Sequence, residues 1–331
     1  MERRSVKIVA TGKYLPKRKV TAQTLANKLG ISSQWIEKKS GVMERYFVED
    51  ETASEMGAQA AKVALLSAGL AIEDIDCIVC ANAAPEQVIP CTAALLQQHL
   101  GRAAIGIPAF DINATCLSFV AALDTMSYLV AAGRYQRVLI VSSEIASSAL
   151  DWSHLESCTL FGDGAAAVIV EQALQSDSAE ICCSRMETYS SGAQMTQCLG
   201  GGSKHHPREY QQHPERFMFQ MQGKAVYRMA AKVLPGFVAR LFAERGYQMR
   251  DMDLVIPHQA SLMAMRLLRK QLGIAEQGLM VTAHNHGNTV AASIPMALHE
   301  AICQRRLRRG DRALLLGTAA GFAAGGIVLE Y

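Results

Sequence analysis

The sequence predicts an α/β protein built from two duplicated halves, and three observations point to this class. Short apolar runs rich in β-branched residues alternate with longer amphipathic stretches, as in sheets that are covered on both faces. Two segments of the first half recur in the second half at nearly the same spacing, which indicates a duplication. Half of the 331 residues are hydrophobic and 19% are charged, so the chain can bury a large interior.

In the first half, five segments have the composition of buried strands. They lie at residues 6–10, 75–81, 109–113, 137–142 and 165–170. Helices are expected between them, at residues 54–68, 90–100 and 116–132. Pro90 suits a first helical position, and Gly101 and Gly133 stand where helices commonly end.

The second half repeats this plan. The run that starts at Gly69 matches the run that starts at Gly246, and the run from Arg137 matches the run from Arg312. The two spacings are 177 and 175 residues. We therefore expect an amino-terminal half at 1–172 and a carboxy-terminal half at 173–331. The polar stretch at about 190–215 is expected to be an insertion that forms a flap.

Composition and charge narrow the class of protein. Lys and Arg number 33 against 30 Asp and Glu, a net charge of +3 that gives no reason to expect nucleic-acid binding. Nine scattered cysteines, an odd number, are typical of reduced thiols in a cytoplasmic enzyme. Cys77 and Cys80 form the one Cys-x-x-Cys pair, inside an apolar run, so we expect core residues and no zinc site.

No segment predicts export or membrane insertion. The apolar run near the amino terminus is too short for a signal sequence. The long uncharged run at 313–329 is interrupted by glycines and Thr318, which favours strand–turn–strand over a membrane helix. We expect a soluble, cytoplasmic protein.

Three places combine a reactive side chain with a strand end. Cys116 follows one predicted strand and opens the next helix, where the helix dipole and free N–H groups would lower its pKa below about 8.5. The alternative is a buried structural cysteine. His258 follows the apolar run at 254–257, and Asn288 lies in a polar turn with His284 and His286. Each could be a cap or loop residue, but together the three could form a nucleophile and an oxyanion-binding pair.

These segments resemble the active site of the thiolase-fold condensing enzymes, most closely the β-ketoacyl-acyl-carrier-protein synthase III family. The resemblance covers essentially the whole chain and implies a thiolase-like fold with a five-layered αβαβα core. It rests on the segment 111–116 and on four motifs: Trp35-Ile-x-x-x-x-Gly41-Val, Phe161-Gly-Asp-Gly-Ala, Pro257-His-Gln-Ala and His286-Gly-Asn-Thr-x-Ala-Ala-Ser-x-Pro.

The resemblance implies a decarboxylating Claisen condensation of an acyl thioester primer with malonyl-acyl carrier protein, which gives a 3-oxoacyl-acyl carrier protein. Cys116 would carry the acyl group, and the backbone N–H groups of Cys116 and Ala320 would bind the oxyanion. His258 and Asn288 would hold the thioester oxygen of the malonyl group during decarboxylation. The substrates would be acyl-CoA or acyl carrier protein, and no metal or other cofactor is expected.

The resemblance also assigns binding residues. The coenzyme A and pantetheine contacts would be Trp35, Lys39, Leu155, Gly223 and Ser261. The acyl pocket would be lined by Phe161 and Met221, with Ile89 contributed by the partner subunit of a homodimer. The residues that would dock the carrier protein are Lys224, Arg228, Arg266, Arg269 and Lys270. Alternatively, these basic residues form an ordinary solvated helix face.

The chain departs from the family pattern at three binding positions. Leu155 replaces an Arg that packs on the adenine of coenzyme A, Ser261 replaces an Asn, and Met263 replaces a docking Arg. Because these changes remove contacts to coenzyme A, the donor of the primer could instead be an acyl carrier protein. Ile89 is smaller than the Phe of members that use short primers, which predicts a medium-length or branched primer. Alternatively, Met221, Phe161 and the insertion set the pocket length.

Other members of the superfamily match less well. Elongating synthases use two histidines, thiolases carry a second cysteine near residues 317–322, and head-to-head condensing enzymes place a glutamate at the position of Ile89. Chalcone-type synthases are usually longer, and a silent partner subunit would lack Cys116. The remaining alternative is an acyltransferase on the same fold that passes the acyl group to an alcohol or amine without decarboxylation.

Overall fold

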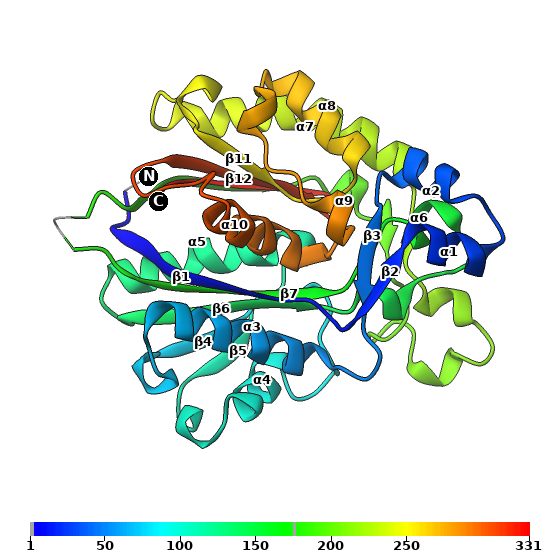
Figure 1. Cartoon of the computed structure of the whole chain (residues 1–331), viewed down its shortest axis with the longest axis horizontal. Coiled ribbons are helices and arrows are strands. Elements are labelled where there is room, and N and C mark those ends of the chain that lie inside the picture. The colour runs from blue at the N-terminus through cyan, green and yellow to red at the C-terminus, as the bar shows by residue number, and fades with distance from the viewer. Residues whose placement is uncertain (1–2, 175–176) are drawn as a thin grey trace.

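The computed structural model describes residues 3–174 and 177–331, and its strands form two main sheets (Figure 1). The first sheet has the order β1 (Val6–Tyr14), β7 (Gly164–Gln172), β6 (Arg137–Glu144), β4 (Cys77–Cys80) and β5 (Ala109–Asp111). The second has the order β11 (Leu254–Pro257), β12 (Arg312–Ala319), β13 (Ala323–Glu330) and β8 (Glu180–Thr188). β4 runs parallel to β5 and β6, and β11 runs parallel to β12; the other neighbours are antiparallel.

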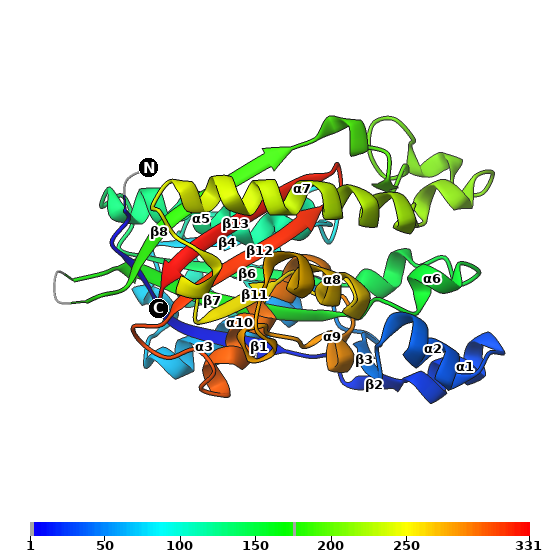
Figure 2. The same cartoon turned by 90° about the horizontal axis from the view of Figure 1, so that it is seen from above.

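Helices cover both faces of each sheet, which gives five layers in the order αβαβα (Figures 1 and 2). On the outer face of the first sheet lie α3 (Ala53–Ala68) and α4 (Thr92–Leu100). α5 (Ser118–Ala131) and α10 (Ser293–Cys303) fill the space between the sheets. α7 (Gly223–Ala243) and α8 (Leu262–Leu272) cover the second sheet. The thiolase-like α/β fold predicted from the sequence is confirmed.

Smaller elements gather at one end of the molecule (Figure 2). β2 (Arg18–Thr21) and β3 (Glu44–Phe47) form a two-stranded sheet that is joined to α1 (Ala22–Leu29) and α2 (Ser33–Ser40). α6 (Leu155–Cys158) lies beside them. The segment predicted as an insertion, about 190–215, follows β8 and contains the short strand β9 (Thr196–Gln197). β9 pairs with β10 (Gln220–Met221), which lies just beyond that segment, and α9 (Ala283–His286) precedes α10.

Corresponding elements of the two halves have corresponding lengths and places. β4 and β11 have four residues each, and β6 and β12 begin at the matched arginines, Arg137 and Arg312. The counterpart of β5 is reduced to a single bridge between Val255 and Leu279. The duplication read from the sequence therefore exists in the fold, with one strand nearly lost from the second sheet.

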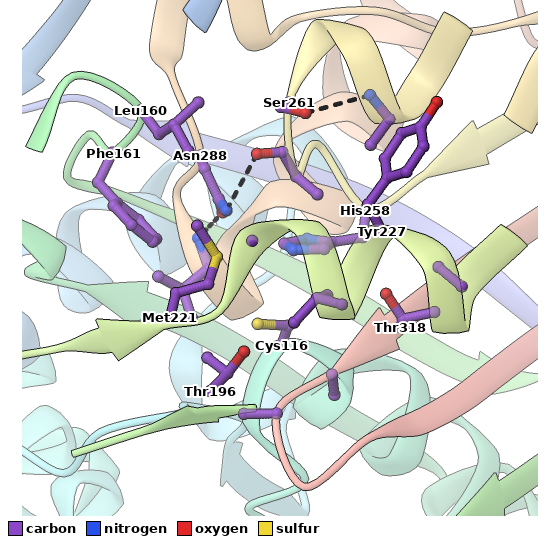
Figure 3. Close-up of a pocket in the computed structure, with 18 of the residues that line it drawn as sticks. Cys116, Leu160, Phe161, Thr196, Met221, Tyr227, His258, Ser261, Asn288 and Thr318 are labelled. Atoms are coloured by element: carbon purple, nitrogen blue, oxygen red, sulfur yellow. Dashed lines mark hydrogen bonds between the residues drawn. The ribbon is translucent and has the colours of Figure 1, made fainter. Parts of the chain in front are cut away.

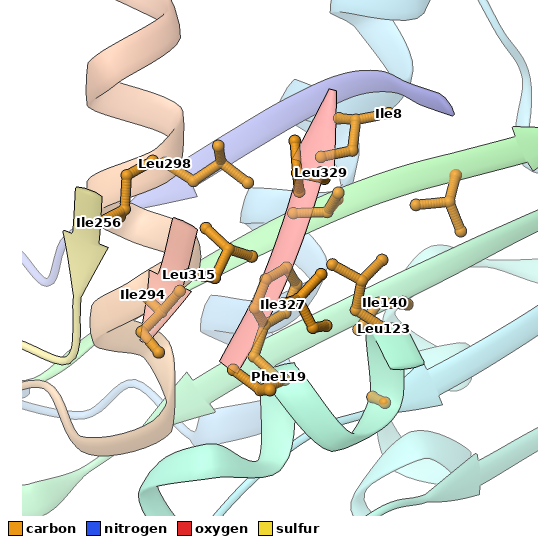
Figure 4. Packing of buried hydrophobic residues seen from close by; sticks show 14 of the residues in the cluster. Ile8, Phe119, Leu123, Ile140, Ile256, Ile294, Leu298, Leu315, Ile327 and Leu329 are labelled. Atoms are coloured by element: carbon orange, nitrogen blue, oxygen red, sulfur yellow. The ribbon is translucent and has the colours of Figure 1, made fainter. Parts of the chain in front are cut away.

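The main core lies between the two sheets, around α5 and α10 (Figure 4). Because a sheet packs against α5 and α10 on each of two sides, the buried residues of these helices are not confined to one narrow stripe. The cluster combines side chains from the helices and from both sheets: Phe119, Leu123, Ile140, Ile294, Leu298, Leu315 and Ile327. This packing fixes the ends of α5 and α10 that carry the residues described below.

The start of α4 differs from the prediction. The helix begins at Thr92, and Pro90 precedes it instead of occupying its first turn. The reason is a distant cap: the Asp111 carboxylate accepts the N–H groups of Thr92 (2.9 Å) and Ala93 (2.8 Å). A carboxylate from the end of β5 thus sets this boundary, which no local pattern around Pro90 could indicate.

Other local predictions are confirmed. The uncharged run after Arg312 forms the β12–β13 hairpin, and Cys77 and Cys80 are buried in β4. In the two stretches that the structure describes, none of the helices combines the length and apolarity needed to cross a bilayer.

Candidate active site

One cavity of about 1170 Å³ receives side chains from both halves of the chain. Cys116, His258 and Asn288 all line it, and Figure 3 shows them converging from three separate segments. Cys116 comes from the turn before α5, His258 from the end of β11, and Asn288 from the turn after α9. The three residues singled out at predicted strand ends therefore lie in one cavity, although they are far apart in the sequence.

Cys116 lies in a tight turn that precedes α5. The turn is a 3-10 helix, η3 (Thr115–Leu117), and α5 begins at Ser118, two residues later than predicted. Thr115 has a positive φ of 51°. Side chains cap the turn: the Asn113 amide oxygen accepts the N–H of Thr115 (2.8 Å), and the Ser118 hydroxyl accepts the N–H of Ala114 (2.9 Å).

The predicted lowering of the Cys116 pKa is wrong. Burial raises the pKa of the thiol to about 12, and the nearby Glu144 carboxylate raises it further. The backbone N–H groups of Ala320 and Cys116 oppose this, but more weakly. The expectation failed because the helix terminus was considered alone, whereas desolvation and a buried carboxylate both disfavour the thiolate.

Ala320 belongs to the turn of the β12–β13 hairpin. Its N–H is aimed at the Cys116 sulfur, and its C=O accepts the Thr115 hydroxyl at 3.4 Å. The turn continues through Gly321 and Phe322, with φ values of 86° and 30°. The hairpin and the nucleophile turn thus meet, and two backbone N–H groups face the same sulfur atom.

His258 is a buried, neutral imidazole. Burial lowers its pKa to about 4, and its Nδ1 atom lies 2.6 Å from the Ser293 hydroxyl. The Ser293 hydroxyl oxygen also accepts the N–H of Gln259 at 3.4 Å, so the hydroxyl proton of Ser293 is available to Nδ1 of His258. An imidazole that accepts at Nδ1 carries its proton on Nε2, the nitrogen left toward the cavity.

β12 passes very close to His258. The histidine N–H donates to the C=O of Leu316 (2.8 Å), which continues the strand pairing. A Cβ atom at Gly317 would lie 2.9 Å from the Cβ of His258, so only glycine fits there. This close approach accounts for the glycine inside β12.

Asn288 presents its amide group to the cavity. Its side-chain oxygen accepts the N–H of Val290 (2.9 Å), which fixes the orientation of the amide. The NH₂ group makes only a long contact with the C=O of Ala260 (3.4 Å) (Figure 3). One of its protons is therefore available to a bound molecule.

The backbone of Asn288 is held by the Phe161 motif. Its N–H donates to Leu160 (2.9 Å), and its C=O accepts the N–H of Gly162 (3.1 Å). A Cβ atom on Gly162 would lie 2.1 Å from the C=O of His286. Gly162 is therefore needed because two backbones touch at this position.

Backbone strain is concentrated at these turns. In the described part of the chain, four non-glycine residues have positive φ, and three of them are Thr115, Val290 and Phe322. They lie one residue before Cys116, two after Asn288 and two after Ala320. Left-handed conformations of such residues cost energy and are typical of functional turns.

Most of the residues assigned to coenzyme A and pantetheine line the same cavity. Trp35 and Lys39 come from α2, Gly223 begins α7, and Ser261 precedes α8. Ser261 already has a structural partner, because its hydroxyl accepts the N–H of Ala264 (3.1 Å) and caps α8. Of the remaining assigned residues, Phe161, Met221, Lys224 and Arg228 also line the cavity.

Some assigned residues lie elsewhere. Leu155 does not line the cavity and packs against the cluster that contains Leu150 and Cys158. Ile89 lies outside this chain's own cavity and is 81% exposed. The three basic residues of α8 also lie outside the cavity, and one of them, Arg269, pairs with Glu276 at 3.2 Å.

Sequence reasoning missed three residues of the site. Ser293 orients His258, and the Gln259 side chain joins the end of β11 to the segment before α9 by accepting the N–H of Thr282 (2.8 Å). Both stand inside quoted motifs, which was the available signal. Glu144, at the end of β6, also lines the cavity, and no motif pointed to it. Across residues 3–174 and 177–331, side chains that could ligate a metal form no group of three or more.

Comparisons with family profiles and with individual proteins point to the same family. The profile of 3-Oxoacyl-[acyl-carrier-protein (ACP)] synthase III matches residues 110–190, and the profile of its C-terminal part matches residues 242–331. β-Ketoacyl-[acyl-carrier-protein] synthase III from Aquifex aeolicus is 34% identical over 98% of this chain and 99% of its own length. The protein of the same name from Neisseria gonorrhoeae is 35% identical over 98% and 99%.

Solved structures agree. The crystal structure of the Aquifex aeolicus 3-oxoacyl-[acyl-carrier-protein] synthase III superposes with a TM-score of 0.88 over 98% of this chain and 100% of that one. The priming β-ketosynthase of the R1128 polyketide pathway is 27% identical, with a TM-score of 0.89 over 99% and 97%. With near-complete coverage, a shared fold and Cys, His and Asn side chains in one cavity, this chain belongs to the 3-oxoacyl-[acyl-carrier-protein] synthase III family.

Proposed function

We propose that this chain catalyses the decarboxylating condensation of an acyl thioester with malonyl-acyl carrier protein, which gives a 3-oxoacyl-acyl carrier protein. One observation carries the proposal: the cavity that contains the Cys116 thiol also contains two N–H donors, on His258 Nε2 and Asn288 Nδ2, for which residues 3–174 and 177–331 provide no strong acceptor. Family membership supports the same reaction, because the relatives are named for it.

In the first half-reaction, the Cys116 sulfur attacks the carbonyl carbon of the primer thioester. The N–H groups of Cys116 and Ala320 stabilise the oxyanion that forms. The carbon–sulfur bond of the donor then breaks, its sulfur takes up a proton, and the acyl group remains on Cys116. Because the resting thiol is protonated, the proton lost by Cys116 balances the proton gained by the departing thiol.

In the second half-reaction, His258 and Asn288 act on the malonyl thioester. Loss of CO₂ leaves negative charge on the thioester oxygen, and two N–H donors aimed at that atom stabilise it. The enolate carbon attacks the acyl-Cys116 carbonyl, and the cysteine thiolate leaves. His258 suits this donor role because burial lowers its pKa, so it remains a neutral imidazole with a fixed proton.

We further propose that an acyl carrier protein docks at the cavity mouth. Lys39, Lys224 and Arg228 line this mouth, and cations there attract an acidic carrier. Arg266 and Lys270 extend the positive surface along α8. The donor of the primer is either a coenzyme A thioester or a carrier protein, and no metal or redox cofactor takes part.

Primer length is proposed to depend on a second subunit. Ile89 is exposed and apolar, as is its neighbour Val88, which suits insertion into the cavity of a partner in a homodimer. Because isoleucine is smaller than phenylalanine, the proposed pocket accepts a medium-length or branched acyl chain. Faster turnover of acetyl-CoA than of octanoyl-CoA would contradict this.

The two half-reactions provide the test. His258→Ala and Asn288→Ala are expected to retain formation of the acyl adduct on Cys116, while decarboxylation of malonyl-acyl carrier protein falls by at least about 100-fold. Decarboxylation is followed as release of labelled CO₂, with Cys116→Ala as the control that cannot be acylated. If both variants decarboxylate at the wild-type rate, the condensation is wrong and transfer to an alcohol or amine becomes the better assignment.

A further inference from the structure

His286 is a buried histidine beside the catalytic cavity that no step of the proposed reaction uses. It is the last residue of α9, two residues before Asn288, and is 7% exposed. Its ring is joined to α10 by a hydrogen bond between Nε2 and the Glu300 carboxylate. Among residues 3–174 and 177–331, its Nδ1 atom has no hydrogen-bond partner. The bond to Glu300 is therefore what orients the imidazole.

Glu300 is itself held by a cation from the first sheet. Lys13 of β1 places its Nζ atom 2.6 Å from Glu300 Oε1, the oxygen that also contacts His286. The side chains of Lys13 and Glu300 are only 20% and 16% exposed, so solvent screens this pair less than a surface pair. The Thr11 hydroxyl also lies 2.9 Å from His299 Nδ1. β1 and α10 are thus joined by two neighbouring side-chain contacts.

β1 is a firm base for these contacts. Successive side chains of a strand point to opposite faces, so Thr11 and Lys13 face α10 while Gly12 faces α3 on the other side (Figure 1). A Cβ atom on Gly12 would lie 2.1 Å from the C=O of Ala60, which means that α3 packs directly on the β1 backbone. Lys13 therefore extends from a strand that is fixed from its opposite face.

The other end of this chain of contacts is the turn that carries Asn288. Gly287 and Val290 in this turn have positive φ values of 68° and 50°. Strained backbone of this kind persists only where the surroundings hold it. The Phe161 motif holds the turn through backbone hydrogen bonds, and the His286 side chain adds a contact with α10. The direction of the Asn288 amide depends on this turn, because the N–H of Val290 orients it.

We propose that His286, Glu300 and Lys13 form an anchor that positions Asn288 for decarboxylation, with His286 as the positioning residue. This rests on the proposed role of Asn288 as a donor to the malonyl thioester oxygen. When the anchor is lost, the Asn288 donor moves away from that oxygen, and a hydrogen bond weakens steeply as its alignment worsens. The loss falls on the second half-reaction, since acylation of Cys116 uses two backbone N–H groups instead.

The experiment compares His286→Gln with His286→Asn. A glutamine amide extends about as far from the backbone as imidazole Nε2 and can donate to Glu300, whereas an asparagine amide ends near the position of Nδ1. In His286→Asn, kcat for decarboxylation of malonyl-acyl carrier protein should fall at least about tenfold, with KM within about threefold and acylation of Cys116 within about twofold of the wild type. In His286→Gln, kcat should stay within about threefold.

Lys13→Met tests the far end of the anchor, with Lys7→Met as the matched control. Lys7 also lies in β1 and is 23% exposed, but it pairs with Glu171 and Asp177 and not with α10. Lys13→Met should lower kcat for decarboxylation at least about threefold, and Lys7→Met should not. Equal rates in the two lysine variants would overturn the proposal, as would an unchanged kcat in His286→Asn or an equal fall in its acylation. If His286→Asn does not fold, the lysine pair still decides.

Hydrogen–deuterium exchange tests the anchor without any substrate. The backbone amides of residues 287–292 should exchange faster in His286→Asn and Lys13→Met than in the wild type and Lys7→Met. Unchanged exchange in both variants would overturn the proposal. If the wild type releases no CO₂ from malonyl-acyl carrier protein, the proposed function fails, and the exchange result still decides whether the anchor holds the turn.

Discussion

At the scale of single residues, the site depends on buried groups held in one protonation state by their surroundings. His258 is kept neutral by burial, and Ser293 selects which nitrogen carries its proton. The residue types Cys, His and Asn could be read from the sequence, together with their place at strand ends. The protonation of Cys116 could not, because the burial that chiefly raises its pKa and the nearby Glu144 carboxylate both depend on the fold.

The depressed pKa of His258 predicts a pH-dependent stability. The folded value of about 4 lies below the ordinary value of 6.5, so the unfolded chain binds a proton first as the pH falls. Stability is therefore complete above about pH 6.5 and is lost progressively down to about pH 4. The wild type should lose about 3 kcal/mol more free energy of unfolding between pH 7 and pH 4 than His258→Gln does.

Urea titrations of both proteins at the two pH values measure this difference. The carboxylates that titrate in the same range are common to both proteins and cancel in the comparison. Equal losses in the two proteins would mean that His258 is solvated and not buried.

At the scale of elements, strands were predicted better than helix starts. The segment 75–81 contains β4, and the segment 137–142 lies within β6. The starts of α4 and α5 were each placed two residues early. Asp111 caps α4 from a neighbouring strand, and the left-handed Thr115 delays α5, so both boundaries depend on tertiary contacts.

The turn that carries Asn288 should be intolerant of a side chain at Gly287. This residue has a φ of 68° and a ψ of −163°, and an added Cβ would lie 2.7 Å from the C=O of Leu160. Gly287→Ala is therefore expected to destabilise the fold by at least about 2 kcal/mol and to reduce decarboxylation more than acylation of Cys116.

The matched control is Gly278→Ala. A Cβ there would meet its nearest neighbour at an ordinary 3.6 Å, so the change should stay within about 0.5 kcal/mol of the wild type. Chemical denaturation of the two variants compares them directly. Equal stability would show that the Gly287 turn can relax without cost.

At the scale of the whole molecule, the two halves are joined through the space between their sheets. Arg4, which precedes β1, is 2% exposed and reaches both halves. Its guanidinium pairs with Asp124 in α5, donates to the Ser184 hydroxyl of β8 (2.8 Å), and stacks 4.2 Å from the centre of the Tyr128 ring. The duplicated pattern in the sequence predicted the two halves but not this connection.

Arg4→Ala should lower the free energy of unfolding by about 2 kcal/mol, because it removes the ion pair with Asp124, the hydrogen bond to Ser184 and the packing of a buried side chain. Arg3→Ala is the control: Arg3 is 60% exposed and pairs with Glu180 at the surface, so its loss should cost less than about 0.5 kcal/mol. Thermal unfolding of both variants measures the two effects. A smaller effect for Arg4 than for Arg3 would contradict this account of how the halves are joined.

The central claim is that Cys116 carries an acyl group which a malonyl thioester then removes. The most direct measurement is intact-protein mass spectrometry after incubation with acetyl-, butyryl-, octanoyl- and longer acyl-CoA, or with the matching acyl carrier proteins, followed by addition of malonyl-acyl carrier protein. We predict an acyl mass on Cys116, highest for a medium-length or branched chain, that disappears as a 3-oxoacyl product forms. An adduct that malonyl-acyl carrier protein cannot discharge, or an adduct that persists in Cys116→Ala, would contradict the account.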